Sequence, residues 1–114
     1  MQTIKVNSYQ RMLNGLYNGR KYAIVKFTGK NCNACKKLEP KFANLDIDID
    51  VYDVNHHENK HISRMFNVRA LPTAVFFEDG TPSFRMCGLG ESEDFFQTVT
   101  DVVTNGCDII SWDK

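Results

Sequence analysis

Two cysteines stand three positions apart in the segment TGKNCNACKK, residues 28–37, directly after an apolar run. At this C-x-x-C spacing, Cys32 and Cys35 could exchange electrons with another disulfide, hold a metal ion, or simply pack. The two sulfurs of such a pair come within bonding reach without a movement of the backbone. A strand followed by a helix would place Cys32 at the helix N-terminus. There the helix dipole favours a thiolate and lowers its pKa from about 8.5 towards about 7 or below.

Redox chemistry would divide the work between the two thiols. The Cys32 thiolate attacks a disulfide in a partner and forms a mixed disulfide, and Cys35, one helical turn along, resolves it. The spacing alone does not decide between the alternatives, because zinc sites also use it. The elements that surround the pair must therefore be considered.

The hydrophobic pattern of the chain predicts elements that fit this junction. Apolar residues at helical spacing predict helices, and short apolar or alternating runs predict strands. The helices are expected at residues 9–17, 34–45, 58–66 and 93–103, and the strands at residues 3–6, 22–27, 47–54, 73–77 and 83–87. Ser8 and Ser92 are the expected N-caps of the first and last helices. Strands that alternate with helices predict an α/β fold with a central mixed sheet of four to five strands and helices on both faces.

Length and composition limit the possible functions. The chain has 114 residues, of which 42% are hydrophobic and 25% charged, and this predicts a single globular domain over residues 1–114. The formal net charge of +0 argues against nucleic acid or an anionic membrane as the main partner. No apolar stretch approaches the roughly 18 residues of a membrane span. We expect a monomer.

The first 21 residues contain no apolar core of a signal peptide, which predicts a reducing cytoplasm. In that compartment the four cysteines of the chain are not a disulfide framework. A close pair there is expected to bind metal or to be redox-active.

Several motifs in the same register resemble the thioredoxin family, over about residues 22–103. They comprise an apolar strand before the cysteine pair, a lysine and a proline after it, the segments VRALPT and AVFFEDG, and a glycine beside the active site. In chain order these are residues 22–27, Lys36, Pro40, residues 68–73, residues 74–80 and Gly88.

This resemblance implies a thioredoxin-like fold and the activity of a protein-disulfide reductase. Cys32 is then the nucleophile, Cys35 is the resolving thiol, and their disulfide is the redox group, with no cofactor and no metal. The implied substrates are disulfide-containing proteins, and the implied electron donor is a thioredoxin reductase or glutathione. The compact chain and its unusual motif also suit a virus-encoded member of the family.

The resemblance also implies a peptide-binding groove beside the cysteine pair. A cis Leu71–Pro72 bond would expose the backbone of Leu71, which pairs with a bound peptide as an extra strand, and Pro72 would keep metal off the thiolate. An ordinary trans proline at the start of a strand is the alternative. The expected lining of the groove is Asn31, Asn33, Ala34, Leu71, Pro72, Cys87 and Gly88.

The sequence departs from the family around the cysteines. The dipeptide between them is Asn33–Ala34, whereas ordinary thioredoxins have Gly-Pro and many glutaredoxins have Pro-Tyr. Thr28 and Asn31 replace the two flanking tryptophans, and the one tryptophan of the chain is Trp112. The rim of the site is therefore predicted to be smaller and more polar than is usual in the family.

Lys26 stands where thioredoxins have a buried aspartate that handles the proton of the second cysteine. A buried ammonium is costly unless it is paired, neutral or able to reach water. We expect Asp53, on the neighbouring predicted strand, to be its partner, and a cation there would favour the thiolate of Cys35. The alternative is that Lys26 reaches solvent without a catalytic role. Lys36 is a further candidate for tuning the thiols.

The other cysteines and the histidines give weaker signals. Cys87 could join mixed disulfides at the groove, but a half-buried small side chain is the simpler interpretation. Cys107 could be exposed and form dimers on oxidation. The spacing of the histidines does not favour a zinc site with the cysteine pair. We expect His56, His57 and His61 to be solvated side chains. They should lie at the sheet edge opposite the turn that carries Cys32 and Cys35, which we call the reactive turn.

Two alternatives to a thioredoxin-type reductase remain open. A glutaredoxin-like, glutathione-coupled reductase would need a Gly-Gly-Asp segment for glutathione, which is missing after Pro72. A non-catalytic binding subunit with the same fold would explain the loss of the aspartate and of both tryptophans. A variant with Cys32→Ser and Cys35→Ser that keeps its function would favour the binding subunit.

Overall fold

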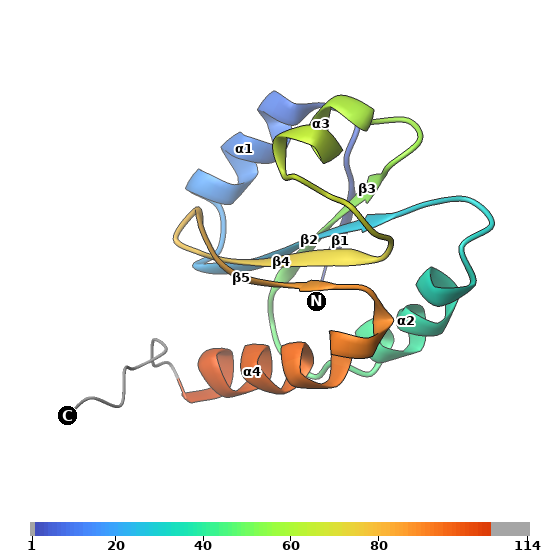
Figure 1. Ribbon diagram of the computed structural model, residues 1–114. Coiled ribbons are helices and arrows are strands. Elements are labelled where there is room, and N and C mark those ends of the chain that lie inside the picture. Colours follow the sequence, from blue (N-terminus) through green and yellow to red (C-terminus); the bar gives the residue numbers. More distant parts are fainter. Residues whose placement is uncertain (1, 106–114) are drawn as a thin grey trace.

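A five-stranded mixed sheet forms the centre of the computed structural model, which describes residues 2–105 (Figure 1). The strand order is β1-β3-β2-β4-β5. β1, β3 and β2 run parallel to one another, whereas β4 is antiparallel to β2 and β5 is antiparallel to β4. The strands are β1 (Gln2–Lys5), β2 (Tyr22–Thr28), β3 (Asp50–Asn55), β4 (Thr73–Glu78) and β5 (Thr81–Cys87).

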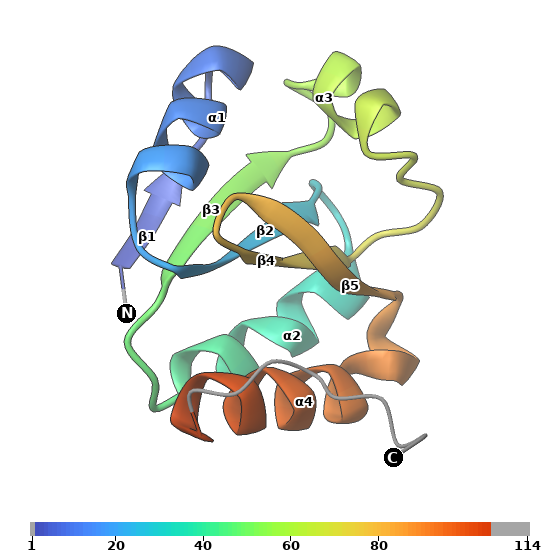
Figure 2. The same cartoon turned by 90° about the vertical axis from the view of Figure 1, so that its left-hand side faces the viewer.

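Helices cover both faces of this sheet, which confirms the predicted α/β architecture (Figure 1, Figure 2). One face carries α1 (Tyr9–Asn18) and α3 (Lys60–Met65), and the other carries α2 (Asn33–Ala43) and α4 (Ser92–Asn105). Ser8 caps α1 as predicted, since its hydroxyl oxygen accepts a hydrogen bond from the backbone N–H of Arg11. Within residues 2–105, no helix is both long enough and apolar enough to cross a membrane.

β2 is the central strand, and it holds the start of the reactive turn in place. Successive side chains of a strand point to opposite faces of the sheet. Val25 and Phe27 therefore belong to the core under α1 and α3, whereas Ile24 belongs to the core under α2 and α4, and all three are fully buried. Burial of a side chain of this kind contributes about 1.5–3 kcal/mol. The end of β2 is thus fixed from both sides.

A two-residue turn joins β4 to β5, and the two strands form an antiparallel hairpin. Asp79 and Gly80 have φ angles of 53° and 79°. Two positive φ angles in succession are what a type I′ turn requires, and Asp-Gly is one of the pairs that adopt it most readily.

β3 begins later than the alternating pattern predicts. The strand starts at Asp50 rather than at residue 47, because its pairing with β2 begins where Ala23 stands opposite Asp50. Ile49 is nevertheless fully buried. The alternation of apolar residues therefore predicted the burial of Ile49 correctly, but the strand that it predicted was too long.

Two helix starts also differ from the prediction. α3 begins at Lys60 because the preceding Asn59 belongs to a turn, in which its side-chain amide donates to the carbonyl oxygen of Asn55. Ser92 is the first residue of α4 rather than its cap, because a 3-10 turn over Leu89–Glu91 runs directly into the helix.

Candidate active site

The cysteine pair lies at the junction of β2 and α2. β2 ends at Thr28, residues 29–31 form a short loop, and Cys32 is the N-cap of α2. Cys32 and Cys35 form a disulfide, with Cα atoms 5.2 Å apart. Cys32 is half-buried, whereas Cys35 is only 5% exposed. Cys32 is therefore the sulfur that a partner can reach.

The N-terminus of α2 creates a positive field at Cys32. The backbone N–H of Cys35 donates a hydrogen bond to Cys32 Sγ over 3.1 Å. The first turn of α2 contains no acidic residue that would oppose the positive end of the helix dipole. After reduction, a Cys32 thiolate can accept the same hydrogen bond, so the geometry favours the nucleophilic form.

A cis peptide bond between Leu71 and Pro72 lies beside this junction. The backbone N–H of Gly88 donates to the carbonyl oxygen of Pro72 over 2.7 Å, which joins the end of β5 to the start of β4. A Cβ atom built on Gly29 would come within 2.9 Å of Leu71 Cδ1. Leu71 therefore lies against the loop that precedes Cys32.

The family model described as Thioredoxin matches residues 2–101. The chain belongs to the thioredoxin family. A solved structure with the same fold is a mutant thioredoxin from Halobacterium salinarum NRC-1, with a TM-score of 0.80 and 20% sequence identity. That alignment covers 96% of this chain and 95% of the other.

Curated relatives of this thioredoxin-family chain include longer proteins. The chain is 36% identical over 73 residues to protein disulfide-isomerase 1 of Caenorhabditis elegans, a match that covers 58% of this chain and 15% of that protein. It is 31% identical over 81 residues to a thioredoxin of Mycoplasma genitalium, with 68% and 79% covered. Against thioredoxin-like 1-1, chloroplastic, of Arabidopsis thaliana, it is 32% identical over 77 residues, with 64% and 28% covered. The chain thus spans less than a third of the length of the first and the third of these relatives.

Family membership and the bonded C-x-x-C pair together identify a dithiol thiol–disulfide oxidoreductase domain. The residues predicted to line its groove form two sets. Asn31, Asn33 and Ala34 adjoin the cysteines along the chain. Leu71, Pro72, Cys87 and Gly88 lie together where β4 begins and β5 ends. Asn31 has a φ of 54°, a conformation that asparagine tolerates better than most residues. The part of this lining in substrate binding remains a prediction.

Lys26 is buried on the face of the sheet that α2 covers. Its side chain is 5% exposed, and Nζ lies 2.9 Å from Glu39 Oε2, a carboxylate whose own side chain is 57% exposed. Nζ also lies 4.7 Å from the centroid of the Phe42 ring, in a cation–π contact. The ammonium is therefore paired, although the partner is not the one predicted.

The predicted pairing of Lys26 with Asp53 is wrong, although the two residues stand in register on β2 and β3. Asp53 Oδ1 instead accepts a hydrogen bond from the Thr28 hydroxyl over 3.3 Å. The long lysine side chain leaves the plane of the sheet and reaches α2, where Glu39 stands one helical turn after Cys35. The helical spacing from Cys35 was the one sequence signal that pointed to Glu39.

Lys36, the third candidate for tuning the thiols, is exposed in the second turn of α2. Its backbone N–H donates to the carbonyl oxygen of Cys32 over 3.1 Å. Residues four apart on a helix lie on the same side, so the Lys36 side chain leaves α2 on the side of Cys32.

His56 and His57, which follow β3, were predicted at the edge opposite the reactive turn, but the structure places them beside it. β3 runs parallel to β2, so both strands end at the same edge of the sheet. The backbone N–H of His56 donates to the carbonyl oxygen of Thr28 over 2.8 Å. A Cβ atom built on Gly29 would come within 2.8 Å of His57 Nε2. Within residues 2–105, no group of three or more His, Cys, Asp or Glu side chains could hold a metal ion.

Cys87 is a free and exposed thiol, not the half-buried side chain that was predicted. It ends the edge strand β5, where no further strand of residues 2–105 covers it. Its backbone N–H donates to Glu91 Oε1 over 2.8 Å. Cys107 and Trp112 lie outside the described residues.

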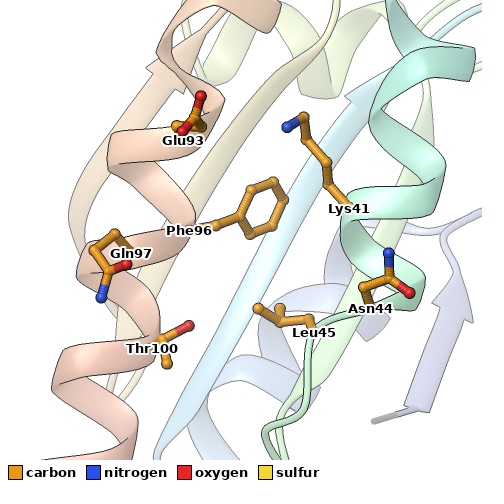
Figure 3. Close-up of a pocket in the computed structure, with 7 residues that line it drawn as sticks. All are labelled: Lys41, Asn44, Leu45, Glu93, Phe96, Gln97 and Thr100. Carbon is orange, nitrogen blue, oxygen red and sulfur yellow. The ribbon is translucent and has the colours of Figure 1, made fainter.

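A pocket between α2 and α4 lies away from the cysteines (Figure 3). Lys41, Leu45 and Phe96 are among its lining residues. Lys41 stands nine positions after Cys32, which corresponds to roughly 13 Å along a helix axis. This pocket is therefore not part of the redox site.

Proposed function

We propose that this domain reduces disulfide bonds of proteins, with Cys32 as the nucleophile and Cys35 as the resolving thiol. The observation that carries the proposal is the unequal setting of the two sulfurs. Cys32 is the accessible N-cap of α2, whereas Cys35 is almost completely buried behind it. A partner can therefore bond to Cys32 but not to Cys35.

The reaction transfers two electrons and two protons to the substrate. The Cys32 thiolate attacks one sulfur of the substrate disulfide, and the other substrate sulfur leaves as a thiolate and takes up a proton. Cys35 then loses its proton and attacks Cys32 Sγ, which releases the second substrate thiol. The product is the Cys32–Cys35 disulfide, the form that the structure contains.

The backbone beside the cis proline supports binding of an extended substrate segment. Leu71 precedes Pro72 and lies against Gly29, next to the reactive loop. A peptide laid there could pair with the Leu71 backbone as an added strand and bring its disulfide to Cys32.

A cycle of this kind needs an electron donor that reopens the disulfide. We propose a thioredoxin reductase or glutathione as the donor, a reducing cytoplasm as the compartment, and a monomer as the working form. The dithiol itself then suffices as the redox group, without a further cofactor.

The reduction potential of the pair tests this proposal. The protein is equilibrated in dithiothreitol redox buffers, alkylated, and analysed by mass. We expect a potential near about −270 mV, as for a thioredoxin-type reductant, whereas a value of about −200 mV or higher would indicate an oxidising or glutathione-coupled role. Absence of any reversible disulfide would leave only a binding role for the domain.

A trapping experiment tests the order of the two thiols. The Cys35→Ser variant should accumulate a mixed disulfide between Cys32 and a disulfide-containing protein, because the resolving thiol is missing. The Cys32→Ser variant is the matched control and should form none, since its remaining thiol is buried. Equal trapping by both variants would contradict the assigned roles.

A further inference from the structure

Four exposed cations stand on the segments that adjoin the accessible sulfur. Lys30 stands two positions before Cys32, Lys36 and Lys37 lie in the second turn of α2, and Arg69 stands two positions before Leu71. The segments that carry them meet at one edge of the sheet, where the loop after β2 leads into α2 and the chain enters β4 (Figure 1). We call Lys30, Lys36, Lys37 and Arg69 the basic rim.

The cations of the basic rim have no ion-pair partner within the part of the chain that the structure describes. None of its four residues forms an ion pair with a carboxylate of residues 2–105. Glu39 pairs with Lys26, whereas Glu91 accepts a hydrogen bond from the backbone of Cys87 and keeps its charge. Glu58 and Glu91 are exposed carboxylates at this edge, and their two negative charges stand against the four positive charges of the basic rim.

The opposite edge of the sheet has the opposite character. Asp46 and Asp48 precede β3, Asp50 begins it, and Asp79 lies in the turn after β4. Arg20 pairs with Asp48 and Asp50 there. Several negative charges therefore lie at the edge opposite the reactive cysteine, whereas the basic rim lies on its own side.

The immediate surroundings of Cys32 offer little apolar surface to a partner. Thr28, Asn31, Asn33 and Ala34 are small or polar, and the apolar Leu71 is only partly exposed. Such a surface gains little from apolar burial, so electrostatic complementarity becomes the main available source of selectivity.

We infer that the basic rim selects protein substrates whose disulfide is flanked by acidic residues. The inference rests on the proposed reductase function and names its substrate class. The partner is a protein because the proposed function acts on disulfide bonds of proteins. Acidic residues of the substrate, attracted by the basic rim, raise the rate of encounter and hold the substrate in register. One exposed ion pair of this kind changes the equilibrium constant of binding by up to about fivefold.

Three disulfide-bonded peptides that differ only in the residues beside their cysteines test the inference. One carries Asp and Glu, one Ser and Asn, and one Lys and Arg. The rate constant for oxidation of the reduced protein by each peptide is measured at low and high salt. At about 0.01 M salt we expect the acidic peptide to react at least about tenfold faster than the basic one. At about 1 M salt the ratio should approach one, because the Debye length falls from about 30 Å to about 3 Å.

Reversal of two charges of the basic rim tests whether the preference for the acidic peptide arises there. The variant with Lys36→Glu and Lys37→Glu should lose or invert the preference for the acidic peptide. Its rates are expressed relative to the neutral peptide, so that a change in the reactivity of Cys32 itself cancels. Lys21→Glu, at the opposite edge directly before β2, is the control and should keep the preference.

Each outcome bears on the inference. Equal rates for the three peptides at low salt would overturn it and leave the proposed reductase function intact. A preference that persists in the Lys36, Lys37 variant would also overturn it. Failure of all three peptides to oxidise the dithiol would overturn both the inference and the proposed function.

Discussion

Replacement of Glu39 by glutamine should destabilise the protein more than replacement of Lys26 by methionine. Glutamine leaves the Lys26 ammonium buried without a counter-charge, and the Lys26 side chain is only 5% exposed. Methionine removes the charge and keeps an unbranched apolar side chain against Phe42. The two halves of one ion pair therefore have unequal effects on the free energy of unfolding.

The magnitude follows from the burial of the two partners. Loss of one partner from a fully buried pair costs about 3–5 kcal/mol. The Glu39 side chain is 57% exposed, so water can take over part of its role. We therefore expect Glu39→Gln to cost about 1–3 kcal/mol. Lys26→Met should lie within about 1 kcal/mol of the parent protein, because apolar replacement of a buried ion is often neutral or stabilising.

Urea unfolding of the oxidised protein, followed by circular dichroism at neutral pH, measures these differences. In a variant that already carries Lys26→Met, adding Glu39→Gln should cost little free energy of unfolding, since no buried ammonium remains. Lys37 is an exposed lysine on α2, the helix that carries Glu39, and Lys37→Met is the control for the loss of one positive charge. A small cost for Glu39→Gln together with a cost above about 2 kcal/mol for Lys26→Met would refute the reasoning. That result would mean that Lys26 stabilises the fold through its contacts rather than requiring its partner.

Three further expectations concern reactivity and charge. Lys26→Met should shift the pH profile of cysteine alkylation in the reduced protein to higher pH, because a cation that favours a thiolate is lost; an unchanged profile would show that Lys26 has no such role. Gly29→Ala should slow disulfide reduction several-fold, because the added Cβ would lie 2.9 Å from Leu71 Cδ1 and would displace the Leu71 side chain from its place against the reactive loop. Arg20 holds the pKa of Asp48 below its usual value of 3.8, and Arg20→Gln should raise that pKa towards 3.8 in an NMR titration.

The structure also provides a control for the Gly29 variant and the direction of the pH effect at Asp48. Gly90→Ala should leave the reduction rate unchanged, since a Cβ atom built there meets no atom within 4 Å. The folded-state pKa of Asp48 is depressed, so its contribution to stability is present above the unfolded pKa and is lost as the pH falls through the folded value. An Asp48 pKa that does not move in the Arg20 variant would contradict the assigned cause.

The sequence predicted those features that depend on local pattern. The period-two and helical patterns located the strands and helices, and the C-x-x-C spacing with Pro72 located the site. These signals are local because the alternation of a strand or the cap of a helix involves only a few neighbouring residues. The mixed sheet followed from the order of the elements.

Features that depend on how elements are placed against one another were not predictable from pattern. The partner of Lys26 depends on how α2 lies over the sheet, which brings Glu39 rather than Asp53 to the ammonium. The location of His57 depends on the direction of β3, and the parallel direction puts it beside Gly29. The start of β3 depends on the length of its neighbour rather than on its own apolar alternation.

The hydrogen bond from the Cys35 backbone N–H to Cys32 Sγ gives the protein a built-in spectroscopic reporter of its redox state. The acceptor of this bond is the atom that changes from a disulfide sulfur to a thiolate, and the hydrogen bond to an anionic acceptor is the stronger of the two. The amide proton of Cys35 should therefore move downfield and exchange more slowly with solvent deuterium when the pair is reduced. Each step of the catalytic cycle can thus be followed at one backbone position, without a fluorophore near the site.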